Sequence, residues 1–396
     1  MRAGLTILAL WAAGLGAAAQ FGKMSVAYPA LEFVYSGQSA QGYAGQSAVA
    51  IGLILSVVGM VGLIFGTTAG LFVARIGPRR AMVGALAIGA VISVMQASFP
   101  PYGLMMVSRL AEGVSHLAIV VVGPTAIAGL ASARFQGAAM TLWSSFFGVA
   151  YAALFWFGPE MVAEQGPQLL FYLHAGWMAV FALVLFVLMP PDPPPSHLAE
   201  PGNLWQQHRR IYASPVLAAP AMGFVFYTVT YVAILTLLPA QMGQSGGFVG
   251  VAMPLVSIAV SLTLGVWLLS RMTAVRLVQA GFGLAILAAL GLWLVWGQVA
   301  ALGFALLIAA SLGVVQGASF AALAELNPKA EDRARGAGAI AQLGNLGTTT
   351  GTPILVWALN KAGISGLALF VIGFSALGIA VHALQAGRRA KTPISG

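Results

Sequence analysis

The chain has 396 residues, of which 60% are hydrophobic and only 7% are charged. Soluble proteins carry about 25% charged residues, so this chain has too little charge to cover a surface that faces water. It contains no cysteine, which excludes disulfides, thiolate metal ligands and cysteine nucleophiles. The net charge is +9, but the basic residues stand at the ends of apolar segments and form no basic stripe, so we expect no nucleic-acid partner.

Apolar segments long enough to cross a lipid bilayer recur from one end of the chain to the other. Polar, glycine and proline residues end them, and they lie near residues 4–34, 44–73, 79–98, 102–131, 136–159, 167–189, 215–241, 247–270, 275–296, 299–325, 335–359 and 364–386. We therefore expect an all-α integral membrane protein with twelve transmembrane helices. The polar segment 191–214 divides it into two six-helix halves, 1–190 and 215–396.

The basic residues predict how these helices are oriented, because Lys and Arg favour cytoplasmic loops. With the N-terminus in the cytoplasm, fifteen of the eighteen Lys and Arg residues lie on the cytoplasmic side. Lys361 alone falls in an external loop, while Lys23 and Arg109 fall inside spans. This bias indicates a multi-pass protein of the bacterial inner membrane with both termini in the cytoplasm.

The two halves resemble each other in sequence, as parallel repeats do. Glu112-Gly113-Val114-Ser115 in the fourth span matches Gln316-Gly317-Ala318-Ser319 in the tenth. Arg134 similarly matches Arg335, and Arg75 matches Arg271, all at an offset of about 200 residues. The halves are therefore expected to be pseudo-symmetric.

The first span contains a charged residue, Lys23. A charge within hydrocarbon costs a few kcal/mol even on lenient scales, so such residues usually face a cavity and mark a transport pathway. We expect Lys23 to contact a solute.

The loop after the second span contains Gly70, Arg75, Gly77, Arg79 and Arg80 at fixed spacings. It resembles the signature loop of the major facilitator superfamily, in which a glycine, three residues and Asp-Arg precede a further glycine and basic residues. The resemblance implies a transporter whose two six-helix halves rock around a central site, with this loop helping to close the cytoplasmic side. Ala74 stands where the family has its aspartate, which puts the charge pairing of that gate in question.

The fourth span carries Arg109, Glu112 and His116, spaced three and four residues apart and so on one helix face. The segment Arg109-Leu110-Ala111-Glu112-Gly113 is similar to a second pattern of this superfamily, loosely in the branch of cyanate- and nitrate-type permeases. An arginine lowers the pKa of a neighbouring carboxylate and desolvation raises it, while histidine titrates near neutrality. We predict that Glu112 and His116, beside Arg109, couple transport to protons.

A second interpretation of the fourth span stays open. Arg109 and Glu112 could merely neutralise each other for membrane insertion, with His116 bonded to a neighbouring helix. Lys23 argues against this interpretation, because with Lys23 and Arg109 charged and His116 neutral one positive charge is uncompensated. A water-filled cavity with a positive surplus attracts anions. Lys23 and Arg109 are therefore predicted to bind an anionic substrate.

Uncharged polar and aromatic residues complete the predicted substrate site. Gln316 occupies the repeat position of Glu112. The other members come from the fifth, seventh and eleventh spans, and are Trp143, Tyr227, Tyr231, Gln342 and Asn345. An amide in a membrane helix equally often bonds only a neighbouring helix.

These features predict a proton-coupled secondary active transporter of a small anionic metabolite that works by alternating access. No phosphate-binding glycine loop is present for ATP, and we expect no metal, no cofactor, no enzymatic activity and a monomer. Two alternatives remain, namely proton-driven efflux of drugs or amphipathic compounds, and a sensor or assembly factor that transports nothing.

Overall fold

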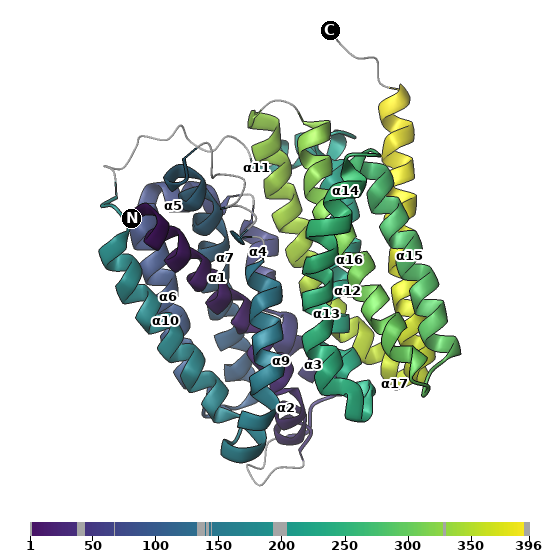
Figure 1. The fold of residues 1–396 in the computed structure, drawn as a ribbon. Coiled ribbons are helices and arrows are strands. Elements are labelled where there is room, and N and C mark those ends of the chain that lie inside the picture. The colour runs from purple at the N-terminus through teal and green to yellow at the C-terminus, as the bar shows by residue number, and fades with distance from the viewer. Residues whose placement is uncertain are drawn as a thin grey trace. The chain divides into compact units, whose positions relative to one another are not determined.

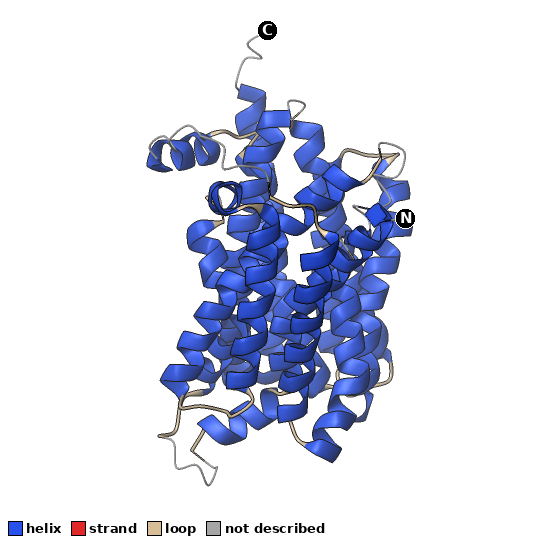
Figure 2. Ribbon diagram, turned by 90° about the vertical axis from the view of Figure 1, so that its left-hand side faces the viewer, coloured by secondary structure: helices blue, strands red, loops and turns tan. Residues whose placement is uncertain are grey.

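The structure is a computed structural model that describes residues 2–37, 44–66, 68–132, 139, 142–143, 145–192, 204–327 and 330–391. All regular structure within these residues is helical (Figures 1 and 2). Helices pair their own backbone N–H and C=O groups, as hydrocarbon requires of a spanning segment. The all-α prediction is therefore confirmed. Two compact units, Met1–Ala199 and Glu200–Gly396, divide within the predicted linker.

Nine described helices form the N-terminal unit. They are α1 (Arg2–Val26), α2 (Tyr28–Tyr35), α3 (Ala48–Ser56), α4 (Gly59–Phe65), α5 (Ala69–Ile76), α6 (Pro78–Gln96), α7 (Tyr102–Leu130), α9 (Phe146–Gln165) and α10 (Gln168–Leu188). The helix α1 packs against α7, α9 and α10, and α6 packs against α7 and α10. Polar residues of α1, α6, α7 and α10 can therefore meet inside this unit.

The second predicted span, 44–73, is not one straight helix. The structure divides it into α3, α4 and α5, and α3 and α4 are bent by 61° relative to each other. The break lies where the carbonyl oxygen of Val58 faces α7 at Gly113, at which an added Cβ would lie 2.5 Å from that oxygen. The sequence pattern missed this break because the residues on both sides of it are equally apolar.

The C-terminal unit contains α11 (Leu204–Ala213), α12 (Ala218–Gln241), η1 (Gly243–Ser245), α13 (Gly246–Val260), the π-helical turn η2 (Ser261–Gly265), α14 (Val266–Leu269), α15 (Ala274–Leu294), α16 (Ala300–Leu326) and α17 (Ala330–Lys391). Its largest packing interfaces join α12 to α17 and α15 to α16. The last two predicted spans both lie in α17 and are separated at Gly363, whose φ of 56° and ψ of −136° are not helical.

The number of spans can be compared with the predicted twelve. Ten helices of the described residues are long and apolar enough to cross a membrane, and the bent pair α3 and α4 makes an eleventh if counted as one span. One of the ten runs from Arg335 to Lys391 and covers two predicted spans. The fifth span also differs from its prediction, because α9 extends to Gln165 and includes Glu160 and Glu164.

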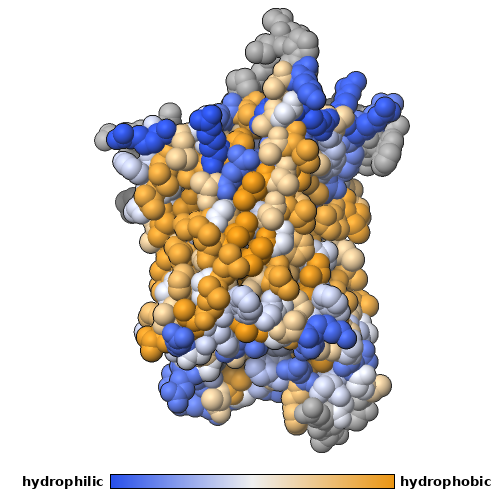
Figure 3. Space-filling view, turned by 90° about the vertical axis from the view of Figure 1, so that its right-hand side faces the viewer, coloured by the Kyte–Doolittle hydropathy of each residue, from blue (hydrophilic) through white to orange (hydrophobic). Residues whose placement is uncertain are grey.

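The surface of the molecule is that of a membrane protein. Figure 3 shows one face on which hydrophobic side chains cover the middle and hydrophilic ones gather towards both ends. Many large apolar side chains are exposed, among them Leu183, Leu294 and Leu384. Soluble monomers rarely expose apolar patches of this extent, so lipid is the solvent that fits this surface.

A buried charge cluster as the candidate functional site

The charged residues predicted inside the first and fourth spans meet within the N-terminal unit. Lys23 Nζ of α1 lies 2.7 Å from Glu112 Oε1 of α7. On the same helix, Arg109 Nη1 donates a hydrogen bond to Glu112 Oε2. None of the three side chains has exposed surface. Glu112 is therefore held between two cations in the interior of the unit.

Arg109 also stabilises the break in the second span. Its Nε donates to the Ile54 carbonyl at 2.8 Å and its Nη2 to the Leu55 carbonyl at 3.2 Å, both near the end of α3. Its Nη1 bonds the Gln20 carbonyl of α1 at 2.9 Å. The last carbonyls of a helix have no partner within the helix and carry partial negative charge. The guanidinium thus caps α3 as well as pairing with Glu112.

Lys23 uses all three of its N–H donors. Besides Glu112, its Nζ lies 3.0 Å from Ser93 Oγ of α6 and 3.1 Å from His174 Nδ1 of α10. We call Lys23, Ser93, Gln96, Arg109, Glu112 and His174 the buried charge cluster. The remaining member, Gln96, donates from Nε2 to Glu112 Oε2 at 3.0 Å.

The contacts of His174 determine its protonation. Its Nε2 lies 3.1 Å from the carbonyl oxygen of Gly16, which can only accept. Its Nδ1 faces the ammonium of Lys23, which can only donate. The imidazole therefore carries its hydrogen on Nε2 and is neutral.

The charges of the cluster do not balance. Lys23 and Arg109 are cations, His174 is neutral, and Glu112 is the one carboxylate that pairs with either cation in the described part of the chain. One positive charge is left in excess. Two buried acceptors, Gln20 Oε1 and Gln96 Oε1, also have no partner among the described residues. These two oxygens can each accept a further hydrogen bond.

His116 lies outside this network. Its Nδ1 is 3.2 Å from the carbonyl oxygen of Ala17, and its ring meets that of Phe21 edge to face with centroids 5.1 Å apart. No hydrogen bond joins it to Glu112 among the contacts of the described chain. Its role in proton coupling stays a prediction.

Sequence reasoning missed three members of the cluster, His174, Ser93 and Gln96. His174 could have been found, because a histidine within the apolar span 167–189 is a rare ionisable residue at membrane depth. Serine and glutamine give no such signal, since both are tolerated in membrane helices as packing residues. Their place beside Lys23 and Glu112 is decided by how α6 packs on α7 and α10.

The predicted aromatic residues are buried within their units. Trp143 packs between α1 and α7, where Cβ atoms added at Gly14 and Gly123 would lie 3.0 and 2.2 Å from its ring. In the C-terminal unit, Tyr227 and Tyr231 stack with centroids 5.1 Å apart. Their contact with a substrate stays a prediction.

The predicted amide residues Gln316, Gln342 and Asn345 share no hydrogen-bond partner among the contacts of the described residues. Gln316 is half-buried in α16, and Asn345 donates to the Ala341 carbonyl of its own helix at 2.8 Å. Gln342 bonds α11, because Tyr212 Oη donates to its Oε1 at 2.8 Å and its Nε2 lies 3.2 Å from His208 Nε2. Burial raises the pKa of Tyr212 to about 12, so this phenol remains a donor at neutral pH. Gln342 thus joins α17 to α11 by hydrogen bonds.

Comparison with known proteins identifies the family. The family model of the Major Facilitator Superfamily matches residues 6–352. The chain belongs to the major facilitator superfamily. The inner membrane transport protein YajR of Escherichia coli (strain K12) is 24% identical over 203 residues, which are 51% of this chain and 44% of YajR.

A solved structure of this superfamily has the same fold. It is a bacterial homolog of the human lysosomal transporter Spinster in an inward-facing, unoccupied conformation. The match covers 99% of both chains with a TM-score of 0.74 and 13% sequence identity. At this identity the likeness establishes the fold of the superfamily.

The signature loop of the superfamily joins α5 and α6 in this chain. Gly70 and Arg75 lie in α5, and Gly77, at a φ of 99°, lies between α5 and α6. The side chain of Asp192, which follows α10, accepts from the backbone N–H groups of Arg79 and Arg80 at 2.7 and 3.1 Å. A carboxylate is therefore present at this superfamily loop despite Ala74, and it comes from a distant segment.

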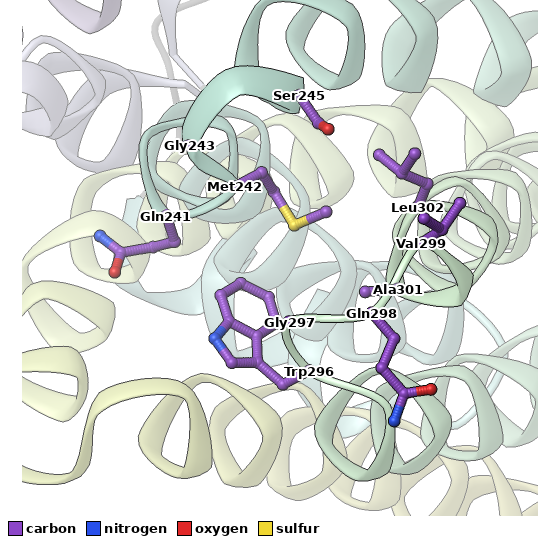
Figure 4. A pocket seen from close by; sticks show the side chains of 10 residues that line it. All are labelled: Gln241, Met242, Gly243, Ser245, Trp296, Gly297, Gln298, Val299, Ala301 and Leu302. Carbon is purple, nitrogen blue, oxygen red and sulfur yellow. The ribbon is translucent and has the colours of Figure 1, made fainter.

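Two pockets lie within the units. One of about 240 Å³ borders Lys23 and His174 among α1, α9 and α10. The other, of about 350 Å³, lies between the ends of α12 and α15 (Figure 4). There the ring of Trp296 and the thioether of Met242 lie near each other, while the amides of Gln241 and Gln298 point away. This second pocket is lined by no charged residue and by none of the predicted site residues.

Proposed function

We propose that this protein is a secondary active transporter that moves a small anionic metabolite together with protons by alternating access. Membership of the major facilitator superfamily supports the transport class. The observation that carries the finer proposal is the ion-paired Glu112, held between Lys23 and Arg109 in a fully buried setting. Charges at membrane depth are costly and are usually retained for function.

Protonation of Glu112 supplies the coupling step in this proposal. A neutral Glu112 no longer compensates Lys23 and Arg109, which leaves two buried cations without a counter-ion. An anionic substrate then compensates them better than water can, because attraction between charges is stronger in a dry interior. Proton and anion therefore favour each other's binding, which is the reciprocity that coupled transport requires.

His116 is proposed as a second proton carrier on the way to Glu112. It lies four residues further along α7, and its Nδ1 contacts the Ala17 carbonyl. Tyr227, Tyr231, Gln316, Gln342, Asn345 and Trp143 are retained as candidate substrate contacts. We also propose that the protein lies in the bacterial inner membrane as a monomer with both termini in the cytoplasm.

Transport by purified protein in proteoliposomes tests the proposal. A panel of radiolabelled small anions, both inorganic and carboxylate, is offered with an imposed pH gradient. We expect gradient-driven accumulation of at least one anion by the wild type. Glu112→Gln should lose this accumulation and retain exchange of the anion across the membrane, because a neutral side chain mimics the protonated carboxyl group.

The matched control is Glu164→Gln, since Glu164 is exposed at the end of α9. It should accumulate the anion as the wild type does. If the Glu112→Gln variant still accumulates the anion under a pH gradient, proton coupling through Glu112 is wrong. If the wild type moves no anion under any gradient, the proposed substrate class is wrong.

A further inference from the structure

The pocket of about 240 Å³ in the N-terminal unit has an almost entirely apolar lining, and its inner end, the floor, borders the buried charge cluster. Its lining includes Phe157, Leu173 and Trp177, which are 60%, 50% and 41% exposed. It also includes Lys23 and His174, which are 0% and 5% exposed. The exposed residues form the entrance and the two buried ones form the inner end.

The entrance faces an apolar environment. Exposed aromatic and aliphatic side chains on membrane-spanning helices contact lipid, and Phe157 of α9 and Leu173 of α10 are of this kind. The residues between entrance and floor, such as Ala19 and Ala150, are small and apolar. A molecule that fills the pocket must therefore be mostly hydrocarbon.

The floor of the pocket lacks a negative charge. The buried charge cluster contains two cations and one carboxylate, so it has one positive charge in excess. Both cations pair with Glu112, so the surplus is one of net charge, and an uncompensated net charge is unfavourable in a buried site. An anionic group that reached the floor from the pocket would compensate this charge.

We propose that this pocket binds a single-chain carboxylate of the medium-chain fatty acid class, with its hydrocarbon chain along α9 and α10 and its carboxylate at Lys23. The size of the pocket supports one short chain, because its volume of about 240 Å³ is smaller than the roughly 300–1,000 Å³ of pockets that hold drug-sized ligands. A two-chain phospholipid fits poorly, because its charged headgroup stays at the membrane surface and cannot reach Lys23.

To reach Lys23, the carboxylate of the bound fatty acid must displace one of the hydrogen-bond partners of Lys23. Lys23 Nζ bonds Glu112, Ser93 and His174, and of these only His174 also lines the pocket. A hydrogen bond between two charged groups is stronger than one to a neutral imidazole. The carboxylate therefore replaces His174 at Lys23, while Glu112 keeps its place. The site shares Lys23 with the proposed transport function, but its occupancy requires no transport and is measured without any gradient.

Equilibrium binding of radiolabelled decanoate to the purified protein in phosphatidylcholine nanodiscs tests the site. We expect decanoate to bind at least tenfold more tightly than decanol, which has the same chain and no charge. Lys23→Gln should reduce the affinity for decanoate to that for decanol and leave decanol binding unchanged. Ala153→Phe, which obstructs the entrance of the pocket, should weaken binding of decanoate at least tenfold.

The control variant is Val180→Phe, which adds the same ring at an exposed position of α10 outside the pocket. It should bind decanoate as the wild type does. The proposal is wrong if decanol binds as tightly as decanoate, if Lys23→Gln leaves decanoate binding intact, or if Ala153→Phe does so. It is equally wrong if added phosphatidylglycerol displaces decanoate, because the pocket then belongs to phospholipid.

Discussion

At the residue scale, the buried charge cluster is asymmetric. Glu112 pairs with two cations, whereas Lys23 and Arg109 share this single carboxylate. Removing Glu112 leaves two buried positive charges, but removing Lys23 leaves the neutral pair Arg109 and Glu112. The cost of a substitution therefore depends on which partner is removed, and this can be measured.

We predict that Glu112→Ala lowers the free energy of unfolding by about 3–5 kcal/mol, the range for breaking a buried ion pair. Lys23→Met should cost less, about 1–3 kcal/mol, because it removes hydrogen bonds to Ser93 and His174 and restores charge balance. Unfolding of each variant by sodium dodecyl sulfate in mixed micelles measures both values. Equal costs, or the opposite order, would contradict the charge balance assigned to the cluster.

Arg109 offers a second prediction, because its guanidinium bonds three carbonyls as well as Glu112. Lysine has three N–H donors on a single nitrogen and cannot reproduce this planar arrangement. Arg109→Lys should therefore lower stability by roughly 2 kcal/mol or more, although the charge is kept. Arg276→Lys, at an exposed position of α15, is the control and should change stability little in the same unfolding assay.

At the element scale, carboxylates from distant segments cap the starts of two helices, α6 and α15. Asp192 accepts from the first N–H groups of α6. In the C-terminal unit, Glu325 of α16 accepts from Ala274 N at the start of α15, at 2.8 Å. The free N–H groups of a helix start carry partial positive charge, so these carboxylates stabilise both helices.

Replacing Asp192 tests this capping. Asp192→Ala should lower the midpoint of thermal unfolding, with a cost of about 1 kcal/mol for a lost cap. Asp192→Asn keeps an acceptor oxygen for the hydrogen bonds. It should lose only the stabilisation that comes from the negative charge at the start of α6. Scanning fluorimetry of the two variants separates the effects. If alanine and wild type unfold at the same temperature, Asp192 does not stabilise α6.

At the scale of the whole molecule, orientation in the membrane follows from the distribution of basic residues. Arg271 lies before α15 and Gln298 lies after it, and both are exposed. The prediction that Lys and Arg mark cytoplasmic loops places Arg271 inside and Gln298 outside. The chain contains no cysteine, which makes these two positions convenient for labelling.

We predict that Gln298→Cys reacts with a membrane-impermeant maleimide on intact cells. Arg271→Cys should react only after the cells are permeabilised. The wild type provides the background, since it has no thiol. Labelling of Arg271→Cys in intact cells would reverse the proposed orientation of α15 and of the termini.

Much of the helical architecture could be predicted from the sequence, because apolar length is a local property. The exceptions have physical causes. The break between α3 and α4 depends on Gly113 and Arg109, which come from another helix. The last two predicted spans lie on either side of Gly363, where the backbone is not helical.

The candidate site was predictable only in part. Lys23, Arg109 and Glu112 stand out because charge is rare in apolar spans, and the structure brings these three together. His116 lies on the predicted side of α7 with Glu112, yet its nitrogen bonds α1 at Ala17. Spacing along one helix places residues on a face, but it does not say which neighbouring helix each of them meets.

The sequence by itself determined that this chain is helical, lies in a membrane and buries a few charges, since hydrophobicity and the cost of a charge in hydrocarbon act on each segment separately. Only the tertiary structure decided which groups satisfy those charges. His174, Ser93 and the carbonyls of Ile54 and Leu55 come from segments far apart in the chain. Hydrogen bonds reach only about 3 Å, so helix packing alone selects the partners.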